Sequence, residues 1–292
     1  MIYEVTHNTT FEYTQSVSIS HHLLHLAPRP NPHQICHRHA LFIEPAPAVT
    51  ENSTDYFGNP TSYITIEEAH DVLSIASRST VEVLSPVVGD PGLSPGWEQV
   101  AKGIEEALGE EMLEISQFRF ESPQAVSDGP AREYALPSFP ADRPILEAAV
   151  DLMDRIYTEF AYEGGVTDIS TPVDTLLNER RGVCQDFAHL QIACLRAMGL
   201  PARYVSGYIM THPPEGKEKL VGADASHAWL SVWVPGDGWT DLDPTNNQIP
   251  SGEHITVAWG RDYADVSPIN GLVIGGGKHE IDVSVNVAPK PD

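Results

Sequence analysis

One cysteine stands where a helix is expected to begin. Cys184 lies in the run Arg-Gly-Val-Cys-Gln-Asp-Phe-Ala-His-Leu, in which a glycine turn leads into a helical pattern of apolar residues. The first N–H groups of a helix have no partner within it and carry partial positive charge, so they stabilise an anion placed beside them. Cysteines in such positions are stabilised as the thiolate, the nucleophilic form. The position of Cys184 therefore predicts a nucleophile rather than a packing residue.

A histidine and an aspartate that can complete a catalytic site follow later in the chain. His227 lies in the run Ser-His-Ala-Trp, and Asp243 lies in the run Asp-Leu-Asp-Pro-Thr. An imidazole can take a proton and return it to a leaving amine, while a carboxylate on its second nitrogen fixes the tautomer and stabilises the imidazolium. The three residues together predict a triad that attacks a carbonyl carbon. Two alternatives stay open, namely Asp241 as the carboxylate and a turn-forming role for Asp243 before Pro244.

The elements that must position these residues follow from the spacing of apolar residues. A helix is expected from Cys184 to about Met198, where Gly199 ends it. An antiparallel sheet for that helix to pack against is expected from five β-prone segments. These segments are residues 202–209, 227–234, 239–242, 254–259 and 280–287.

Two of these strands form a hairpin that carries His227 and Asp243. The two residues are 16 positions apart (243 minus 227), and the turn-rich run Pro235–Gly238 lies between them. A simple hairpin register sets His227 opposite about residue 246. Asp243 is then close to the ring but needs a bulge, a longer loop or strand twist to meet it.

The first part of the chain consists of β-prone runs separated by Pro, Gly and Asn. Regular strands with such punctuation suggest a β-sandwich-like domain. The expected strands cover residues 3–13, 18–26, 40–44, 62–67 and 72–83.

The middle of the chain reads as a connection between two folded parts. Ser85–Gly96 is rich in Pro and Gly, Trp97–Ser116 has a helical pattern, and the proline-rich run Glu121–Arg143 predicts a long loop. A helix with one buried face is expected from Pro144 to about Thr158. We therefore expect an α+β chain. Its expected parts are a β-rich domain over residues 1–85, a linker with one helix and a long loop over 86–143, and a catalytic core with C-terminal strands over 144–292.

Several motifs together resemble one known family. The motifs are Gly182–Asp186, Leu195–Tyr208, Ser226–Trp229, Asp243–Thr245 and, outside the core, Asp55–Asn59 and Gly260–Pro268. They are similar to the bacterial transglutaminase-like family of the papain-like cysteine protease superfamily, whose core follows an N-terminal β domain. The resemblance implies a papain-like core and a Cys-His-Asp triad at Cys184, His227 and Asp243.

An acyl-transfer site also needs donors for the developing oxyanion. The backbone N–H of Cys184 is available by its position at the helix start. The resemblance implies an aromatic or amide side chain as second donor, and Tyr162 is our candidate. His189, about 140° round the helix from Cys184, is expected to be structural, as is Asp186 in the first turn.

A metal site is the alternative use for one histidine-rich segment. His33, Cys36, His37 and His39 contain zinc-ligand types, but strand alternation sends Cys36 to the face opposite His37 and His39. Some members of the family that the chain resembles use calcium, but the acidic residues here are dispersed and form no oxygen-ligand loop. We therefore expect no metal and no cofactor.

Charge and cysteine content narrow the partners and the compartment. The formal net charge is -24, which opposes binding to nucleic acid and to anionic membrane surfaces. The sequence shows neither a signal peptide nor an apolar run long enough to span a bilayer. Three cysteines, an odd number, fit a reducing compartment. We expect a cytoplasmic protein that acts on a peptide or protein, and the sequence does not determine its oligomeric state.

Three functions are compatible with these residues. The first is a cysteine protease or peptidase, a thiol hydrolase in which water accepts the acyl group. The second is a transglutaminase or amidase, because the acceptor is chosen by access and water exclusion rather than by the triad. The third is a catalytically silent binding module. The resemblance to prokaryotic proteases favours the first.

Overall fold

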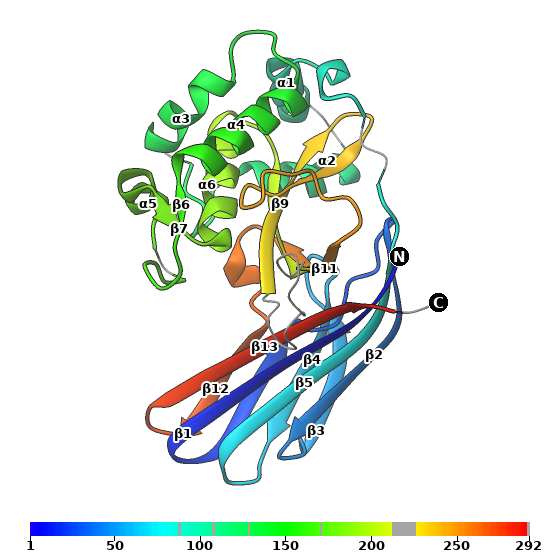
Figure 1. The fold of residues 1–292 in the computed structure, drawn as a ribbon, viewed down its shortest axis with the longest axis vertical. Helices are drawn as coiled ribbons and strands as arrows, with labels where there is room; N and C mark the ends of the chain where they lie inside the picture. The colour runs from blue at the N-terminus through cyan, green and yellow to red at the C-terminus, as the bar shows by residue number, and fades with distance from the viewer. Residues whose placement is uncertain (87–88, 107–108, 128, 170, 212–225, 291–292) are drawn as a thin grey trace, which may run out of the picture.

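The computed structural model describes residues 1–86, 89–106, 109–127, 129–169, 171–211 and 226–290. A strand-rich part lies at the bottom of Figure 1 and a helix-bearing part at the top. The two chain ends lie near each other where these parts meet, and the Lys290 N–H donates to the Ile2 carbonyl at 2.8 Å. The predicted α+β class is confirmed.

A single long strand organises the strand-rich part. Among the described residues, seven strands form one antiparallel sheet around β1 (Ile2–Leu24). The first half of β1 lies between β5 and β13, and its second half lies between β4 and β12. The bounds of the other strands are β2 (Gln34–Glu44), β3 (Val49–Thr54), β4 (Pro60–Ile66), β5 (His70–Val83), β12 (Ile269–Gly275) and β13 (His279–Pro289).

This sheet curls over on itself. The ring centroids of Phe11 and His22 are 6.4 Å apart. Eleven residues of straight strand would separate them by about 36 Å. The side chains of Leu24, Ile64 and Leu73 are buried between the two layers that result. The predicted sandwich-like packing is therefore made by two halves of one curled sheet, not by two separate sheets.

The sequence predicted that the segment 280–287 joins the sheet beside the Cys184 helix, and this prediction is wrong. β13 pairs with β1 instead, with Val5 opposite Val287, and β12 also pairs with β1. Val285 and Val287 bury their side chains at the junction of the two parts. Local sequence shows that this segment is a strand, but its partner lies more than 260 positions away and is chosen by packing.

The helices surround one core. Their bounds are α1 (Trp97–Glu106), α2 (Glu110–Ser116), α3 (Gly129–Ala135), α4 (Ile145–Glu159), α5 (Val173–Glu179) and α6 (Cys184–Ala197). The helix expected over residues 97–116 is thus two helices, and the loop expected over 121–143 contains α3. Ala131 is fully buried, and its carbonyl accepts from the Cys194 thiol at 3.3 Å, so α3 packs on α6 despite its prolines. No helix in the described ranges is long and apolar enough to cross a membrane.

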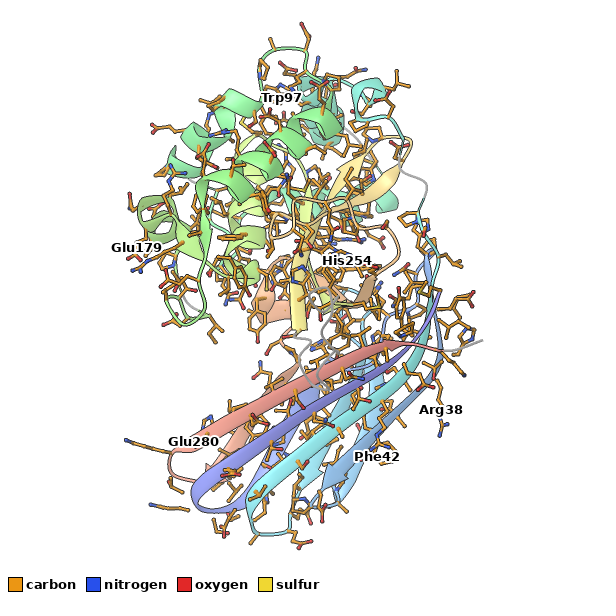
Figure 2. All side chains as sticks on the ribbon, viewed as in Figure 1. Arg38, Phe42, Trp97, Glu179, His254 and Glu280 are labelled. Carbon is orange, nitrogen blue, oxygen red and sulfur yellow. The ribbon has the colours of Figure 1, made fainter. Side chains whose placement is uncertain are left out.

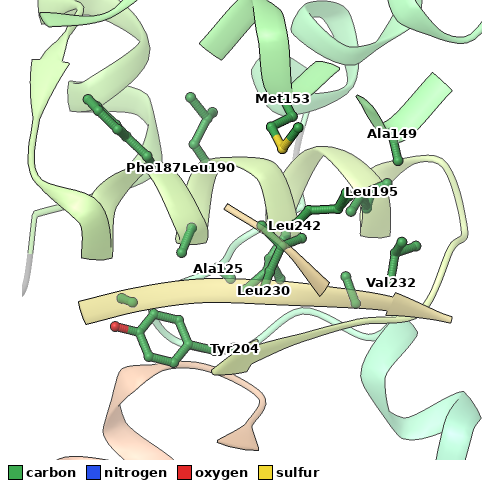
Figure 3. Packing of buried hydrophobic residues seen from close by; sticks show 14 of the residues in the cluster. Ala125, Ala149, Met153, Phe187, Leu190, Leu195, Tyr204, Leu230, Val232 and Leu242 are labelled. Carbon is green, nitrogen blue, oxygen red and sulfur yellow. The ribbon is translucent and has the colours of Figure 1, made fainter. Parts of the chain in front are cut away.

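A four-stranded antiparallel sheet supports α6. Its order is β10-β9-β8-β11. Leu190 and Leu195 of α6 face Leu230 and Val232 of this sheet across a close-packed core (Figure 3). The predicted strands are confirmed as β8 (Ala202–Ile209), β9 (Ser226–Val234), β10 (Gly238–Leu242) and β11 (His254–Gly260).

Two side-chain amides join the two sheets. β11 pairs with β8 along one edge only, so its other edge presents unpaired backbone groups. Gln34 accepts from the Thr256 N–H at 2.8 Å and donates to the Thr256 carbonyl at 2.7 Å. Asn59 does the same for Trp259, at 2.9 and 2.8 Å. The amides therefore take the place of a neighbouring strand along the free edge of β11.

The Asn59→Ala variant tests this role. It leaves two partly buried backbone groups of Trp259 without partners, and each unsatisfied group costs about 1–3 kcal/mol. We expect the free energy of unfolding in urea to fall by about 2–5 kcal/mol. Asn270→Ala, at an exposed position of β12, is the matched control and should change it by less than about 0.5 kcal/mol. Equal effects of the two variants would contradict the account.

Candidate active site

The start of α6 is closely packed around Gly182. The short strands β6 (Ala161–Tyr162) and β7 (Arg181–Gly182) pair in parallel just before the helix. A Cβ on Gly182 would lie 2.7 Å from the Asp186 carboxylate and 2.8 Å from Leu176. That carboxylate accepts from the Val183 N–H at 2.8 Å and so caps the helix, the structural role expected for Asp186. Cys184 is the first residue of α6 and is half-buried.

The hairpin register brings His227 and Asp243 together without a bulge. Leu242 pairs with Leu230, and continuing this register sets Asp243 opposite Trp229 and residue 245, not 246, opposite His227. His227 and Trp229 point to the same face because they are two residues apart on one strand. Asp243 is thus a diagonal neighbour of His227, and His227 Nε2 lies 2.8 Å from Asp243 Oδ2.

His227 also interacts electrostatically with Cys184. Its Nε2 atom is taken by Asp243, so the Nδ1 side of the ring faces the sulfur. Burial alone would lower the pKa of His227, but the hydrogen bonds and negative charges of Asp243 and Cys184 raise that pKa to about 10. The ring is therefore held as an imidazolium at neutral pH, the form that can donate a proton to a leaving group.

Asp243 is fully buried, and both of its carboxylate oxygens accept hydrogen bonds. Its Oδ2 atom accepts from His227, from His254 Nε2 at 2.9 Å and from Asn246 Nδ2 at 2.7 Å. Its Oδ1 atom accepts from the backbone N–H groups of Thr245 and Asn246 at 3.0 and 3.2 Å. Burial alone would raise the pKa of Asp243, but the bonds from the two histidines hold it well below its usual range.

Sequence reasoning missed His254 and Asn246. Asn246 had a signal, because Asp-Pro-Thr-Asn is a run in which an aspartate accepts from backbone N–H groups two and three residues on. His254 had none, since it lies on β11 at the opposite edge of the sheet. Figure 2 labels His254 close to where the helix-bearing part meets the strand-rich part.

A second glycine makes room for the His254 contact. Gly207 of β8 lies opposite His227 on β9 and opposite Thr256 on β11. A Cβ there would lie 2.1 Å from the Ile255 carbonyl oxygen and 2.6 Å from the Trp229 ring. The missing side chain lets the strands on both sides approach, so that both histidines reach one carboxylate.

The other candidates are placed as follows. Asp241 accepts from Trp229 Nε1 at 3.1 Å and from the Ser231 hydroxyl, and no hydrogen bond joins it to His227 among the described residues. His189 is buried, stacks on Tyr204 at 4.8 Å and accepts from the Tyr263 N–H at 3.2 Å, which is a structural role.

Two tyrosines lie near the thiol. Tyr162 pairs with Gly182 across the β6–β7 bridge and is 61% exposed. Partial burial, with the charges of Cys184 and Asp186, raises the pKa of Tyr162. Burial and the charge of Cys184 also raise the pKa of Tyr204, well above its ordinary value. Tyr204, which the sequence did not single out, is therefore another phenol close to the sulfur, and the oxyanion role of Tyr162 stays a prediction.

One group of side chains has the composition of a metal site. His227 Nε2, Asp243 Oδ2 and His254 Nε2 all lie within 4.8 Å of one another, the one such group in the described residues. Two imidazoles and a carboxylate can hold a divalent cation. Here both nitrogens hydrogen-bond to the carboxylate oxygen instead. In the segment weighed for zinc, His37 pairs with Glu82 and His39 with Ser79, so these histidines point to separate partners.

Comparison with known proteins agrees with this architecture. Residues 3–82 match the model of the bacterial transglutaminase-like N-terminal region. Residues 137–244, which include the three predicted site residues, match the transglutaminase-like superfamily. The chain belongs to this transglutaminase-like family.

Some relatives are similar to almost the whole chain, and others only to part of it. An uncharacterized protein of Mycobacterium tuberculosis is 45% identical over 298 residues, covering 98% of this chain and 92% of the relative. A protein-glutamine gamma-glutamyltransferase of Pseudomonas aeruginosa is 35% identical over 104 residues, but these cover 34% of this chain and 16% of that enzyme. The solved structure of a candidate cysteine protease from Cytophaga hutchinsonii shares the fold, with a TM-score of 0.76, 22% identity and coverage of 99% and 90%.

The ion pair predicts a pH dependence of stability. Because the pKa of His227 rises from 6.5 to about 10 on folding, its contribution is complete below about pH 6.5 and is lost as the pH rises through 10. Because the pKa of Asp243 is lowered, its contribution is present above about pH 4 and is lost as the pH falls further.

Urea unfolding of the Asp243→Asn variant checks this window. The difference in the free energy of unfolding between wild type and variant should be largest near about pH 5–6 and narrow towards about pH 10. The comparison cancels the titration of groups that the two proteins share. A difference that stays constant from about pH 5 to 10 would show that the pair is not ionised as described.

Proposed function

We propose that this protein is a thiol acyl-transfer enzyme that hydrolyses an amide bond in a peptide or protein substrate. The proposed catalytic residues are Cys184, His227 and Asp243. The observation that supports this most is the 2.8 Å hydrogen bond between buried His227 and buried Asp243, with His227 interacting electrostatically with Cys184 at the N-terminus of α6. Nucleophile, base and orienting carboxylate stand in the order that acyl transfer needs.

The proposed reaction has two halves. The Cys184 thiolate attacks the carbonyl carbon, and the oxyanion forms beside the first N–H groups of α6. His227 then donates its proton to the leaving amine, which leaves an acyl-thioester. In the second half water adds to the thioester with His227 as the base, and the thiolate returns. Tyr162 is the proposed second oxyanion donor, and this chemistry uses no cofactor.

Asp243 and its donors orient the imidazole. The carboxylate accepts from His227 Nε2, so the proton that the ring transfers is the one on the nitrogen facing the sulfur. His254 and Asn246 fix the carboxylate from two further directions and act on the reaction through it. They are proposed as positioning residues.

A glutamine acyl transferase is the second candidate function. The glutamyltransferase of Pseudomonas aeruginosa, similar over 104 residues, supports it. The same thioester would then pass to an amine, because the triad does not choose the acceptor. A silent binding module is the third reading, and it requires that the site has no turnover although its three residues are assembled.

The compartment is part of the proposal. We propose that the protein works in the cytoplasm, because none of the three cysteines, all in the described residues, forms a disulfide. The strongly acidic chain favours neutral or basic peptides over acidic ones as substrates.

The products of the reaction decide between these functions. Denatured proteins are incubated with the enzyme and a fluorescent primary amine, and the products are analysed by mass spectrometry. Hydrolysis predicts new peptide termini, whereas transfer predicts the amine on glutamine side chains. EDTA should leave the activity unchanged, and no product with folded wild type would overturn both enzymatic proposals.

Three substitutions assign the catalytic roles. Cys184→Ala and His227→Ala should each lower kcat/KM by at least about 10³-fold, and Asp243→Asn by about 10²–10⁴-fold. Cys194→Ala is the matched control, because this thiol is buried on the same helix and binds the Ala131 carbonyl. It should stay within about threefold of wild type, and equal losses for Cys184 and Cys194 would contradict the assignment.

A further inference from the structure

A large cavity lies behind the catalytic sheet. Its volume is about 850 Å³. Leu230 and Val232 of β9 face α6, whereas Ser231 and Trp233, which alternate with them, line the cavity on the other face. Its remaining walls come from β8, β10 and β11, from residues 249–251, from the strand-rich part, and from the end of α2 with the segment that follows it. Neither Cys184 nor His227 is among its described lining residues, whereas His254, which donates to Asp243, is. The cavity therefore borders the hydrogen-bond network of Asp243 but is not lined by the thiol.

A buried guanidinium borders this cavity. Arg203 of β8 is 8% exposed, and its Nε donates to the Ser231 hydroxyl at 3.3 Å. The guanidinium carbon lies 3.7 Å from the ring centre of Trp259 and 4.4 Å from that of Trp239. The two indoles therefore fix the guanidinium plane. Its two terminal nitrogens have no hydrogen-bond partner among the described residues.

The charge of Arg203 also has no direct counter-ion. No carboxylate oxygen of the described residues lies within 4.0 Å of its nitrogens. The oxygens of Asp241, the acid whose charge acts on Arg203, accept from Trp229 and Ser231. A buried cation without a partner is costly. Burial lowers the pKa of Arg203 to about 9. The positive charge of Arg29 also lowers this pKa, whereas the negative charge of Asp241 raises it.

A second guanidinium increases the positive charge of the same wall. Arg29 lies 3.5 Å from the ring centre of Trp259. It must cover the ring face opposite Arg203, since two groups cannot occupy one face at these distances. Arg29 donates to the neutral oxygens of Phe57 and Asn59. Two cations thus enclose one indole in a chain whose net charge is -24.

We propose that this cavity binds a small ligand that carries one carboxylate on a flat apolar body. The fork of two terminal nitrogens on Arg203 matches a carboxylate in bidentate geometry. Phe57, Phe118 and Trp239 line the cavity and offer rings for the apolar body. The volume of about 850 Å³ falls in the range of about 300–1,000 Å³ of small-molecule sites.

The acidic lining residues narrow the ligand further. Glu114, Asp237 and Asp241 also border the cavity. Their charges repel a ligand with several negative groups, so a monocarboxylate fits where citrate or a polyphosphate does not. The competing explanation is that the Arg203 and Trp stack serves the fold alone, with water on the free nitrogens.

Wild-type protein and 4-bromobenzoate test the proposal directly. Crystals soaked with this probe should show anomalous density of bromine inside the cavity, with the carboxylate on Arg203. The melting temperature should rise with 4-bromobenzoate and stay unchanged with 4-bromobenzyl alcohol, its neutral analogue. Absence of bromine from the cavity, or equal shifts for acid and alcohol, would overturn the proposal.

Two variants and one labelling measurement sharpen the result. Arg203→Gln should weaken 4-bromobenzoate binding by at least about tenfold. Arg78→Gln, on an exposed arginine of β5, is the matched control and should bind the probe like wild type. If Arg203→Gln does not fold, the bromine position in wild type decides. The probe should not slow alkylation of Cys184 by iodoacetamide, and protection of that thiol would place the probe in the catalytic site and contradict the proposal.

Discussion

The fully buried carboxylate of Asp243 is the constraint on which the rest of the site depends. A buried negative charge needs hydrogen-bond donors to replace water. Among the described residues, five hydrogen bonds reach this carboxylate from β9, β11 and the turn after β10. These segments must therefore meet at one point. The meeting point sets the hairpin register, brings His227 to the start of α6 and requires a glycine at position 207.

The strand-rich part also helps to fix the position of the Asp243 carboxylate. β11 carries His254 at its start, and the amides of Gln34 and Asn59 hold the free edge of this strand. His7 of β1 also contacts the Tyr208 hydroxyl at 2.9 Å. The N-terminal sheet thus contributes to the geometry of the carboxylate although it supplies none of the three proposed catalytic residues. This gives a physical reason for the two parts to occur in one chain.

The sequence predicted what local pattern determines and missed what distant packing decides. The strand carrying His227 and the helix starting at Cys184 have clear apolar periodicity and were placed correctly. The partner of β13 and the contact of His254 depend on segments far apart in the chain, and no spacing rule reveals them. The helix α3 was missed because Pro130 lies in its first turn, Pro137 follows it, and its stability comes from burial against α6. The Arg203 stack had no sequence signal, since its indoles lie on two other strands.

The measurement that tests the central claim most directly is the rate of Cys184 alkylation by iodoacetamide from about pH 4 to 9, located by mass spectrometry. Buried Cys194 serves as the internal control. The account predicts rapid labelling of Cys184 well below about pH 8, and loss of this reactivity in His227→Ala, because the imidazolium stabilises the thiolate. Labelling that sets in only above about pH 8, and equally in both proteins, would contradict the ion pair and favour a silent binding module.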